Sequence, residues 1–260
     1  MSDCFLSIVF PAHNEEKRLP RTLEQTAAFL QAQPYSAEII VVENGSTDRT
    51  LAVAEEHAAR LPMLRVIHEE QRGKGRAVRR GMLAARGEYR FFCDVDLSMP
   101  ITEINRFFPP QLEGAEIVIA SREAPGSVRY NEPAYRHTTG RVFNWMVKTL
   151  ALPGIEDSQC GFKCFSAPAA EALFPLQTIM GWSFDVELLY AARRRGLRIV
   201  ELDIPWYFNP DSKVHVLRDS WRMFWDLLSI RWNGFRGRYP PLAAVHRPGC
   251  SPRRACGTVG

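Results

Sequence analysis

The sequence predicts an α/β fold with a mostly parallel central sheet and helices on both of its faces. Short apolar runs typical of buried strands alternate with segments of helical periodicity through the first half of the 260-residue chain. This alternation, at spacings that suit βαβ units, favours a parallel sheet. Right-handed crossovers then place helices on both faces. Polar clusters follow five of the strands, where such sheets bind ligands.

Each expected strand is an apolar run that stops at a polar residue or a proline. Each expected helix repeats its apolar residues every three or four positions, and Ser46 or Thr47 can cap the second one. The expected strands span 5–10, 38–42, 64–68, 89–93, 116–120, 160–165 and 198–204. The expected helices span 19–32, 49–60, 73–86, 101–108, 135–150, 184–195 and 214–232.

The composition is that of a packed domain. Hydrophobic residues make up 46% and charged residues 24% of the chain, which excludes disorder throughout and collagen-like classes. No stretch reaches the roughly 18 apolar residues of a spanning helix, and the first ten residues lack the basic region of a secretory signal. Six cysteines are too few for a disulfide scaffold, so we expect reduced thiols in a cytosolic protein.

The net charge of +4 is unevenly distributed. Residues 213–260 hold nine Lys or Arg and two Asp or Glu, whereas residues 1–212 hold 24 basic and 27 acidic side chains. A slightly acidic body with a basic C-terminal part argues against a nucleic-acid partner. It suggests instead a local anionic partner for residues 213–260.

Asp94 and Asp96 form the most informative polar cluster. They directly follow the apolar strand 89–93, and residues two apart in an extended chain point the same way. Two such carboxylates suit a hard cation, Mg²⁺ or Mn²⁺, which would bridge a substrate diphosphate. The alternative is a pair of solvated aspartates in a turn.

Two other clusters carry weaker signals. Glu43 ends the strand 38–42 and could accept a hydrogen bond from a nucleotide base, or it could support the dipole of the following helix. Gly45 permits a tight turn after it. Residues 72–76 (RGKGR) resemble a phosphate loop without matching the Walker pattern, and Lys74 adds a positive charge there. A solvated basic turn is the alternative for this loop.

Seven motifs in order carry a resemblance that covers roughly residues 5 to 235. They are PAHNEEKRLP at 11–20, VVENGSTDRT at 41–50, RGKGRAVRRGM at 72–82, DVD at 94–96, DSQCGFKCF at 157–165, WSFDVELLYAARRRG at 182–196 and DSKV at 211–214. Together they resemble the inverting family-2 glycosyltransferases of GT-A fold, a Rossmann-like architecture. Within them the chain looks most like the dolichyl-phosphate β-glucosyltransferases, with the mannosyltransferases as cousins.

The resemblance implies a nucleotide-sugar donor, a divalent metal and a polyprenyl phosphate acceptor. It implies that Asp96, Asp157 and Arg122 act in catalysis and that Asp94 and Asp96 hold the metal. The implied donor-binding residues are Pro11, Ala12, Glu15, Glu43, Gly45, Lys74, Asp94 and Val95. Arg136, Ser212 and Lys213 would hold the acceptor phosphate. His13 and Ser98 depart from the usual pattern, Ser98 standing where mannosyl relatives often have a further metal ligand, Gln.

A polyprenyl phosphate is anionic near neutral pH, so it needs positioning more than a general base. We expect in-line displacement with inversion. Asp157 is the candidate for a substrate hydroxyl contact or residual base, with capping of a turn as the alternative. Asp185 and Glu187 would face the site by resemblance, or be buried in an ion pair.

The resemblance and the residue pattern together imply an organisation. Residues 1–212 would form the catalytic domain, with a nucleotide-binding half at about 1–122 and an acceptor half at about 123–212. Residues 213–238 would form an amphipathic basic and aromatic helix, and 239–260 a disordered tail. The helix carries an apolar stripe flanked by arginines, which fits a bilayer interface, although packing on the catalytic domain is the alternative. Its stripe is Leu217, Trp221, Phe224, Leu228, Trp232 and Phe235.

These observations predict a hexosyltransferase that moves glucose from UDP-glucose onto a dolichyl-type phosphate. It would be cytoplasmic and peripheral at the inner membrane face, or recruited there by a membrane-protein partner. A GDP-mannose-dependent enzyme or another acceptor is the alternative within the family. A sugar nucleotidyltransferase is disfavoured because the loop at 11–16 lacks its glycine-rich pattern. A non-catalytic nucleotide-sugar binding module is disfavoured by the joint presence of Asp94, Asp96, Lys74 and Arg122.

Overall fold

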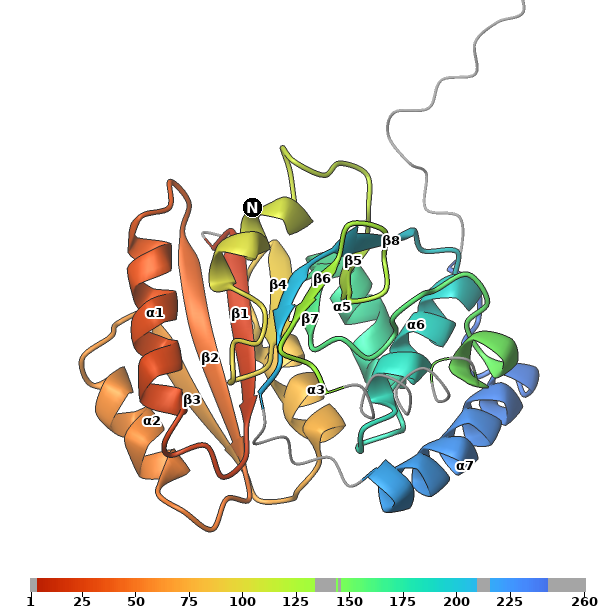
Figure 1. Ribbon diagram of the computed structural model, residues 1–260, viewed down its shortest axis with the longest axis horizontal. Helices are drawn as coiled ribbons and strands as arrows, with labels where there is room; N and C mark the ends of the chain where they lie inside the picture. The colour runs from red at the N-terminus through yellow and green to blue at the C-terminus, as the bar shows by residue number, and fades with distance from the viewer. Residues whose placement is uncertain (1–3, 134–143, 145, 210–215, 243–260) are drawn as a thin grey trace, which may run out of the picture.

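A seven-stranded sheet runs through the middle of the computed structural model, which describes residues 4–133, 144, 146–209 and 216–242 (Figure 1). Its strand order is β3-β2-β1-β4-β7-β5-β8. The strands are β1 Leu6–Ala12, β2 Ala37–Asn44, β3 Leu64–Glu69, β4 Tyr89–Cys93, β5 Ile117–Ser121, β7 Phe162–Ser166 and β8 Ile199–Asp203. Only β7 runs against its neighbours β4 and β5 within this sheet. The predicted mostly parallel sheet is confirmed.

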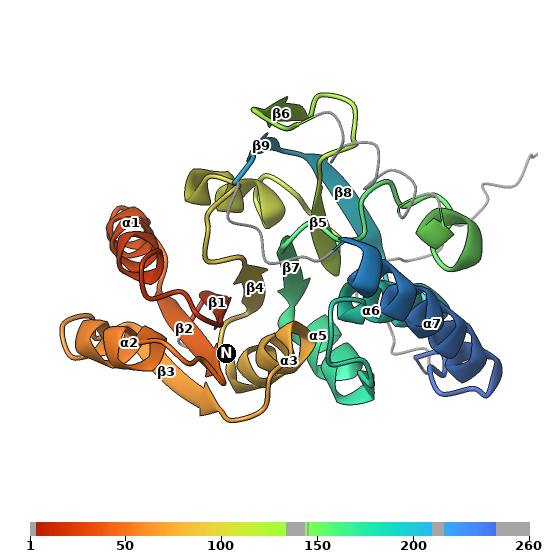
Figure 2. The same ribbon diagram turned by 60° about the horizontal axis from the view of Figure 1, so that its bottom comes forward.

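Helices cover both faces of the sheet, as predicted (Figure 2). One face carries α1 Leu19–Gln31, α2 Thr50–Ala58 and the 3₁₀ helix η1 Ile101–Phe107. The other carries α3 Lys74–Ala84, α5 Ala167–Leu173, η2 Phe174–Leu176, α6 Phe184–Arg194 and α7 Val216–Phe235. Most of the helix expected at 135–150 lies outside the described residues.

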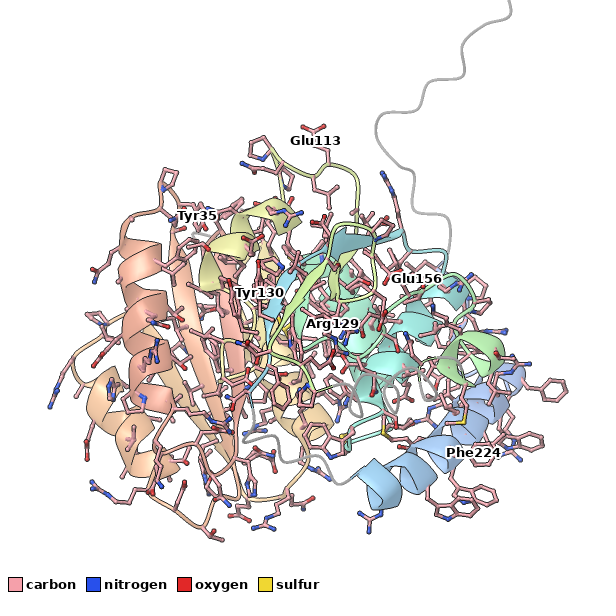
Figure 3. All side chains as sticks on the ribbon, in the orientation of Figure 1. Tyr35, Glu113, Arg129, Tyr130, Glu156 and Phe224 are labelled. Atoms are coloured by element: carbon pink, nitrogen blue, oxygen red, sulfur yellow. The ribbon has the colours of Figure 1, made fainter. Side chains whose placement is uncertain are left out.

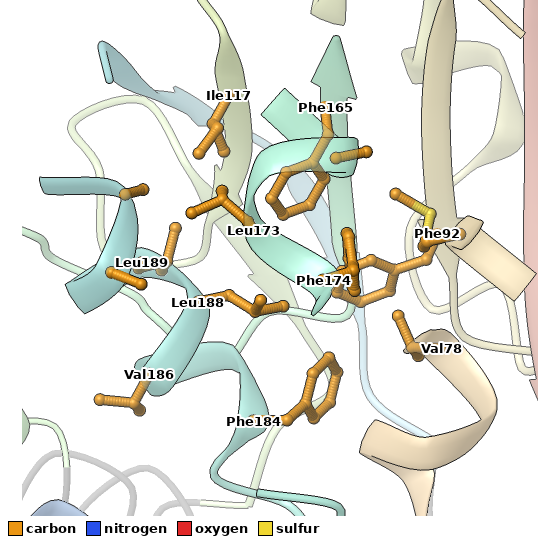
Figure 4. Close-up of a cluster of buried hydrophobic side chains, with 14 of the residues drawn as sticks. Val78, Phe92, Ile117, Phe165, Leu173, Phe174, Phe184, Val186, Leu188 and Leu189 are labelled. Carbon is orange, nitrogen blue, oxygen red and sulfur yellow. The ribbon is translucent and has the colours of Figure 1, made fainter. Parts of the chain in front are cut away.

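The strands are apolar on both sides because both faces are covered. In β1, Leu6, Ile8 and Phe10 point into the core beneath α1, whereas Val9 points into the core beneath α3. Figure 4 shows this second core, in which Phe92 and Phe165 of the sheet meet the helical side chains. Burial on both faces fixes the register of each strand and hence the position of the loop that follows it.

The second helix begins differently from the prediction. Asp48, rather than Ser46 or Thr47, meets its first turn, because Asp48 Oδ1 accepts the backbone N–H of Thr50 at 3.0 Å. The Ser46 hydroxyl instead accepts the N–H of Asn14 at 3.0 Å, and Thr47 N–H donates to Asn14 Oδ1 at 2.8 Å. These bonds tie the loop after β2 to the loop after β1, two neighbouring parts of the same edge.

A second, two-stranded sheet lies beside the end of β5. It pairs β6 Val128–Tyr130 with β9 Pro205–Tyr207 in parallel, and the rings of Tyr130 and Tyr207 stack 4.5 Å apart. The carbonyl of Ser98 accepts the N–H of Tyr207 at 2.8 Å, which joins this sheet to the loop after β4. The small sheet therefore borders the edge where the polar clusters gather.

The C-terminal helix is part of the main domain. Leu227 and Ile230 of α7 are fully buried in the core that includes α6. Tyr239 is also buried and donates to Glu187 Oε1 at 2.8 Å, so the expected start of a disordered tail at 239 is wrong; residues 243–260 lie outside the described part. Within the described residues, no helix has the length and apolarity needed to cross a membrane.

Candidate active site

The carboxyl ends of β1 to β5 meet along one edge of the sheet, as predicted from the polar clusters. Because β7 is antiparallel, the loop that precedes it, residues 157–161, lies at the same edge. Asp94 N–H donates to the carbonyl of Gly161 at 3.0 Å, joining the ends of β4 and β7. The direction of β7 thus brings the DSQCG segment to the paired aspartates.

Lys74 and Asp94 form an ion pair at the centre of this edge. Lys74 Nζ lies 2.5 Å from Asp94 Oδ1 and 5.4 Å from the centroid of the Trp182 ring. Burial lowers the pKa of Lys74, but the charges of Asp94, Asp185 and Asp96 outweigh it and raise that pKa. Lys74 therefore stays protonated, and its charge offsets part of the negative charge of the aspartate cluster.

Of the two aspartates, Asp96 has the less neutralised charge. Burial and the neighbouring charge of Asp94 both raise the pKa of Asp96, while Ser98 lowers it through hydrogen bonding. Ser98 N–H donates to Asp96 Oδ1 at 3.0 Å. Leu97 between them has φ of 45°, a strained value for a branched side chain. The turn holds the Asp96 carboxylate beside Asp94 against their mutual repulsion.

Gly161 makes room for the Asp94 carboxylate. A Cβ atom placed on Gly161 would lie 2.0 Å from Asp94 Oδ2 and 2.4 Å from its Cγ. Contacts this short do not occur between non-bonded atoms, so any side chain at position 161 must displace Asp94. Sequence reasoning missed this role, although Gly161 belongs to the quoted DSQCGFK motif.

Glu43 is buried at the end of β2 and makes two contacts. Its Oε1 accepts the N–H of Ser46 at 2.5 Å, and its Oε2 lies 2.6 Å from Nδ1 of His68 on β3. His68, which the sequence analysis did not single out, is half exposed. Gly45 has φ of 65°, so the turn after Glu43 needs glycine as expected.

The other predicted donor-binding residues lie at the end of β1 and in the loops after β1 and β4. Ala12 lies opposite Glu43 in the β1–β2 register, and Pro11 lies opposite Val42. Glu15 forms a two-point ion pair with Arg18, at 2.6 and 2.8 Å, and its N–H donates to the Thr50 hydroxyl. Val95 is buried, and its carbonyl accepts the hydroxyl of Thr22 at 2.5 Å. The predicted residues therefore lie at the ends of β1 and β2, in the loops after β1, β2 and β4, and at the start of α3; they are Pro11, Ala12, Glu15, Glu43, Gly45, Lys74, Asp94 and Val95.

Arg122 and Asp157 bind each other. The Asp157 carboxylate accepts Nε of Arg122 at 2.6 Å, Nη2 at 2.9 Å and the backbone N–H at 3.0 Å. Burial would raise the pKa of Asp157, but Arg122 lowers it to about 2. So acidic a group is a weak base, which disfavours the base role considered for Asp157. The pairing also engages the guanidinium of Arg122, which the resemblance assigned to catalysis.

Trp206 of β9 lies against the same guanidinium. Its ring centroid is 5.6 Å from Cζ of Arg122 and 5.9 Å from Cζ of Arg129, which is labelled with Tyr130 on β6 (Figure 3). Two cations on one indole fix both arginines beside the loop after β5. Sequence reasoning missed Trp206 because a three-residue strand leaves no periodic signal.

The glycines of the RGKGR loop allow close packing against a neighbouring segment. A Cβ on Gly73 would lie 2.5 Å from the carbonyl oxygen of Met180, and one on Gly75 would lie 2.9 Å from that of Ile179. Arg76 N–H donates to Met180 O at 3.3 Å. The segment around 179–180 therefore covers the start of α3, and anion binding by this loop stays a prediction.

Asp185 and Glu187 support the site from behind. Asp185 forms a buried ion pair with Lys163, with Asp185 Oδ1 2.8 Å from Lys163 Nζ, as the alternative interpretation expected. Glu187 accepts the N–H groups of Thr178 and Ile179, each at 2.8 Å, and makes no ion pair in the described part of the chain. Glu187 thus holds the segment that packs on Gly75, and the charge of Asp185 helps to raise the pKa of Lys74.

Three predicted residues, Arg136, Ser212 and Lys213, lie outside the described residues, and so does the DSKV motif.

The four cysteines that the structure describes are free thiols. Burial raises the pKa values of Cys93, Cys160 and Cys164, that of Cys160 to about 12. These thiols are therefore protonated and unreactive near neutral pH.

The arrangement matches a known protein family. The model of glycosyl transferase family 2 matches residues 7–171, which include β1 to β5, β7 and the aspartate pair. The chain belongs to glycosyl transferase family 2. The resemblance stated from the seven motifs is thereby confirmed, and His68, Gly161 and Trp206 are additions that its motifs alone did not reveal.

Curated relatives of this family-2 chain extend over most of its length. A dolichyl-phosphate beta-glucosyltransferase of Dictyostelium discoideum is 32% identical over 251 residues, covering 91% of this chain and 77% of the relative. A protein of the same name from Homo sapiens is 32% identical over 249 residues, covering 90% and 77%. The family-2 likeness thus reaches beyond residue 171 into the second half of the chain.

Solved structures share the fold of the family-2 domain. Glucosyl-3-phosphoglycerate synthase from Mycobacterium tuberculosis, in complex with Mn²⁺, UDP-glucose and phosphoglyceric acid, superposes with a TM-score of 0.64 at 20% identity. The match covers 93% of this chain and 82% of the other. The predicted GT-A fold is confirmed, because the central sheet and its flanking helices are common to both.

Proposed function

We propose that the chain transfers glucose from UDP-glucose, with inversion, onto a polyprenyl phosphate of the dolichyl type. The observation that carries the proposal is identity of 31–34% to proteins named dolichyl-phosphate beta-glucosyltransferase, over 83–91% of this chain. The paired acids beside Lys74 support donor binding at the edge of the sheet. The Mn²⁺ and UDP-glucose complex of the structural neighbour supports the donor class.

A divalent metal fits the residues present. Asp94 and Asp96 offer carboxylate oxygens of the kind that Mg²⁺ and Mn²⁺ prefer. The pKa of Asp96 is raised by burial and, in addition, by the neighbouring charge of Asp94, which a cation would offset. Within the described residues, no His, Cys, Asp or Glu completes a group of three. The two aspartates would hold the ion together with substrate oxygens and water. When bound, the metal supplies charge that stabilises the leaving nucleotide diphosphate.

The protein's own groups divide the work on the donor. Glu43, fixed by Ser46 and His68, presents a buried carboxylate where a base N–H can donate. Lys74 adds a fixed positive charge next to the diphosphate position, in a site where burial strengthens electrostatic interactions. The Arg122–Asp157 ion pair joins the loop after β5 to the loop before β7 beside this site.

The acceptor needs little proton transfer, which agrees with the weak basicity of Asp157. A phosphate monoester already carries more than one negative charge at neutral pH. Arg136, Ser212 and Lys213 are proposed to hold it, by resemblance. The chain leaves β6 and β9 at the same end of one parallel sheet, a few residues before these positions, which supports their acting together.

The acceptor's tail belongs in lipid, so we place the reaction at the cytoplasmic face of the inner membrane, with the protein peripheral or recruited by a membrane-protein partner. Nucleic acid has no role in this proposal. GDP-mannose remains the alternative donor, because the sequence motifs also resemble those of the mannosyltransferases.

The test offers purified protein UDP-glucose or GDP-mannose, with Mn²⁺ and a short polyprenyl phosphate, and measures labelled lipid. We expect product from UDP-glucose, and loss of product in Asp96→Ala with an unchanged thermal midpoint. Glu56→Ala, an exposed carboxylate on α2 paired with Arg49, is the matched control and should keep full activity. Product from GDP-mannose alone would replace the sugar assignment, and full activity of Asp96→Ala would overturn the site.

A further inference from the structure

Helix α7 presents a continuous aromatic face to the outside. Trp221, Trp225, Trp232 and Phe235 are 65%, 53%, 55% and 83% exposed, and Leu228 among them is 39% exposed. They recur every three or four residues, so they share one side of the helix. The stripe extends about 21 Å at 1.5 Å per residue. Few soluble surfaces leave so much contiguous aromatic area uncovered.

The opposite face of α7 is fixed to the domain. Met223, Leu227 and Ile230 are buried, and a Cβ on Gly234 would lie 2.5 Å from the hydroxyl of Tyr190 on α6. Leu227 and Trp232 are about 140° apart around the helix at 3.6 residues per turn. The two interpretations of this helix are therefore compatible: one face packs on the catalytic domain while the other stays free. Figure 3 shows Phe224, at the edge of the free face, on the outer side of the molecule.

Arginines border the aromatic face on both sides. At 100° per residue, Arg222 and Arg236 lie along one border and Arg231 along the other. Arg236 Cζ is 4.9 Å from the Trp232 ring centroid, and Arg231 also donates to the carbonyl of Leu150. Among the α7 side chains that the structure describes, Asp226 is the only acid, and it is half-buried on the side toward α6.

We propose that the aromatic face of α7 docks on the interface of a membrane that contains anionic lipids. Tryptophan, with an apolar ring and a polar N–H, is the residue enriched where hydrocarbon meets headgroups. Arginines beside it match anionic headgroups, and a helix of this pattern lies in the plane of the interface. The inference deepens the proposed membrane location and does not depend on which sugar is transferred.

A second copy of the chain fits this face less well. Two copies joined face to face would bring arginine borders against arginine borders, with no acidic side chain from the described outward face of α7 to pair with them. Like charges brought together at an interface disfavour association. A lipid surface supplies phosphates along the whole stripe, so the charge pattern favours the membrane.

The test measures co-sedimentation of the full chain with vesicles of phosphatidylcholine, with and without phosphatidylglycerol. We expect binding that is stronger with phosphatidylglycerol. Replacing the three tryptophans together (Trp221→Ser, Trp225→Ser, Trp232→Ser) should lower the partition coefficient about tenfold or more, because each ring contributes apolar burial. Arg222→Gln with Arg236→Gln should lower binding only to the anionic vesicles.

Controls separate this inference from the transfer reaction. Leu83→Ser removes an exposed apolar side chain from α3 and should bind vesicles like wild type. Transfer of glucose to a short water-soluble polyprenyl phosphate, without vesicles, should survive in the triple tryptophan variant. Unchanged vesicle binding in that variant would overturn the inference. The inference would also be overturned if sedimentation equilibrium showed a wild-type dimer that the triple tryptophan variant does not form, and if the wild-type monomer did not bind vesicles.

Discussion

Replacing Gly161 by alanine tests the site, because the added methyl group would displace the carboxylate of Asp94. The new Cβ would lie 2.0 Å from Asp94 Oδ2, whereas ordinary contact begins at 3.4 Å, so the oxygen must retreat by about 1.4 Å. Retreat moves the carboxylate relative to Lys74 Nζ, now 2.5 Å from Oδ1. The backbone cannot give way easily, because Gly161 O also accepts the N–H of Asp94.

A displacement above 1 Å at a reacting centre costs about 10²-fold in rate, or about 2.7 kcal/mol of transition-state stabilisation. We therefore expect Gly161→Ala to lower kcat/KM for UDP-glucose by about 10²-fold or more, and to weaken the dependence on Mn²⁺. Crowding the buried loop should destabilise the fold by about 1–3 kcal/mol. In a domain of this size that corresponds to roughly 2–4 °C for each kcal/mol.

The assay is steady-state transfer with Mn²⁺ varied, together with calorimetry of UDP binding and a thermal melt. Gly181→Ala is the matched control, because a Cβ at Gly181 meets nothing within 4 Å and the residue lies beside Trp182 in the same region. Wild-type kcat/KM and Mn²⁺ dependence in Gly161→Ala would refute the reasoning. An equal loss in Gly181→Ala would show that the effect is not the contact with Asp94.

Three other changes have expected outcomes. Asp157→Asn should destabilise the protein by about 3–5 kcal/mol in thermal melts, because it leaves the largely buried charge of Arg122, whose side chain is 26% exposed, without its partner. In the wild type, the pKa of Asp157 is lowered to about 2, so its stabilisation is complete above pH ~4 and lost as the pH falls toward 2 in acid titrations. Glu43→Gln should raise the KM for UDP-glucose about tenfold with a smaller change in kcat, since it weakens a bond made in both ground and transition states. Tyr239→Phe removes the hydroxyl that donates to Glu187 and should cost about 1.5–3 kcal/mol in denaturant unfolding.

Matched variants make these results interpretable. Asp203→Asn breaks a half-exposed pair with Arg106 and should cost about 1 kcal/mol or less, against which Asp157→Asn is judged. Glu38→Gln perturbs another carboxylate of β2, away from the turn at Gly45, and should leave the KM for UDP-glucose unchanged. Wild-type stability of Asp157→Asn or Tyr239→Phe would contradict the contacts described, and a wild-type KM of Glu43→Gln would remove the base-reading role.

The sheet was predictable because each strand is an uninterrupted apolar run. β1, β2 and β4 fill both cores with alternating side chains, and a run of that kind has few other stable conformations. Whether a helix is α or 3₁₀ was harder to predict from the sequence. The buried side chains Ile101, Ile104 and Phe107 are spaced by three, the period of a 3₁₀ helix, but a seven-residue segment was interpreted simply as helical.

The site was predictable as far as each cluster follows its own strand. Asp94, Asp96, Glu43 and Lys74 met at one edge because parallel strands end together. The partner of Asp157 was not predictable, since Arg122 is 35 residues away in sequence and the contact depends on the direction of β7. The apolar pattern of a short strand does not depend on the direction of the chain. The sequence therefore did not indicate that β7 is antiparallel.

The buried Glu187 has a mechanical consequence. Tyr239, just after α7, donates to Glu187, which also accepts the N–H groups of Thr178 and Ile179. The Ile179 segment in turn packs against Gly75, next to Lys74. A continuous series of hydrogen bonds and close contacts thus runs from the segment after α7 to the start of α3, where Lys74 lies. If α7 rests on a bilayer, this linkage fixes the distance between the headgroups and the edge of the sheet that carries Lys74 and Asp94.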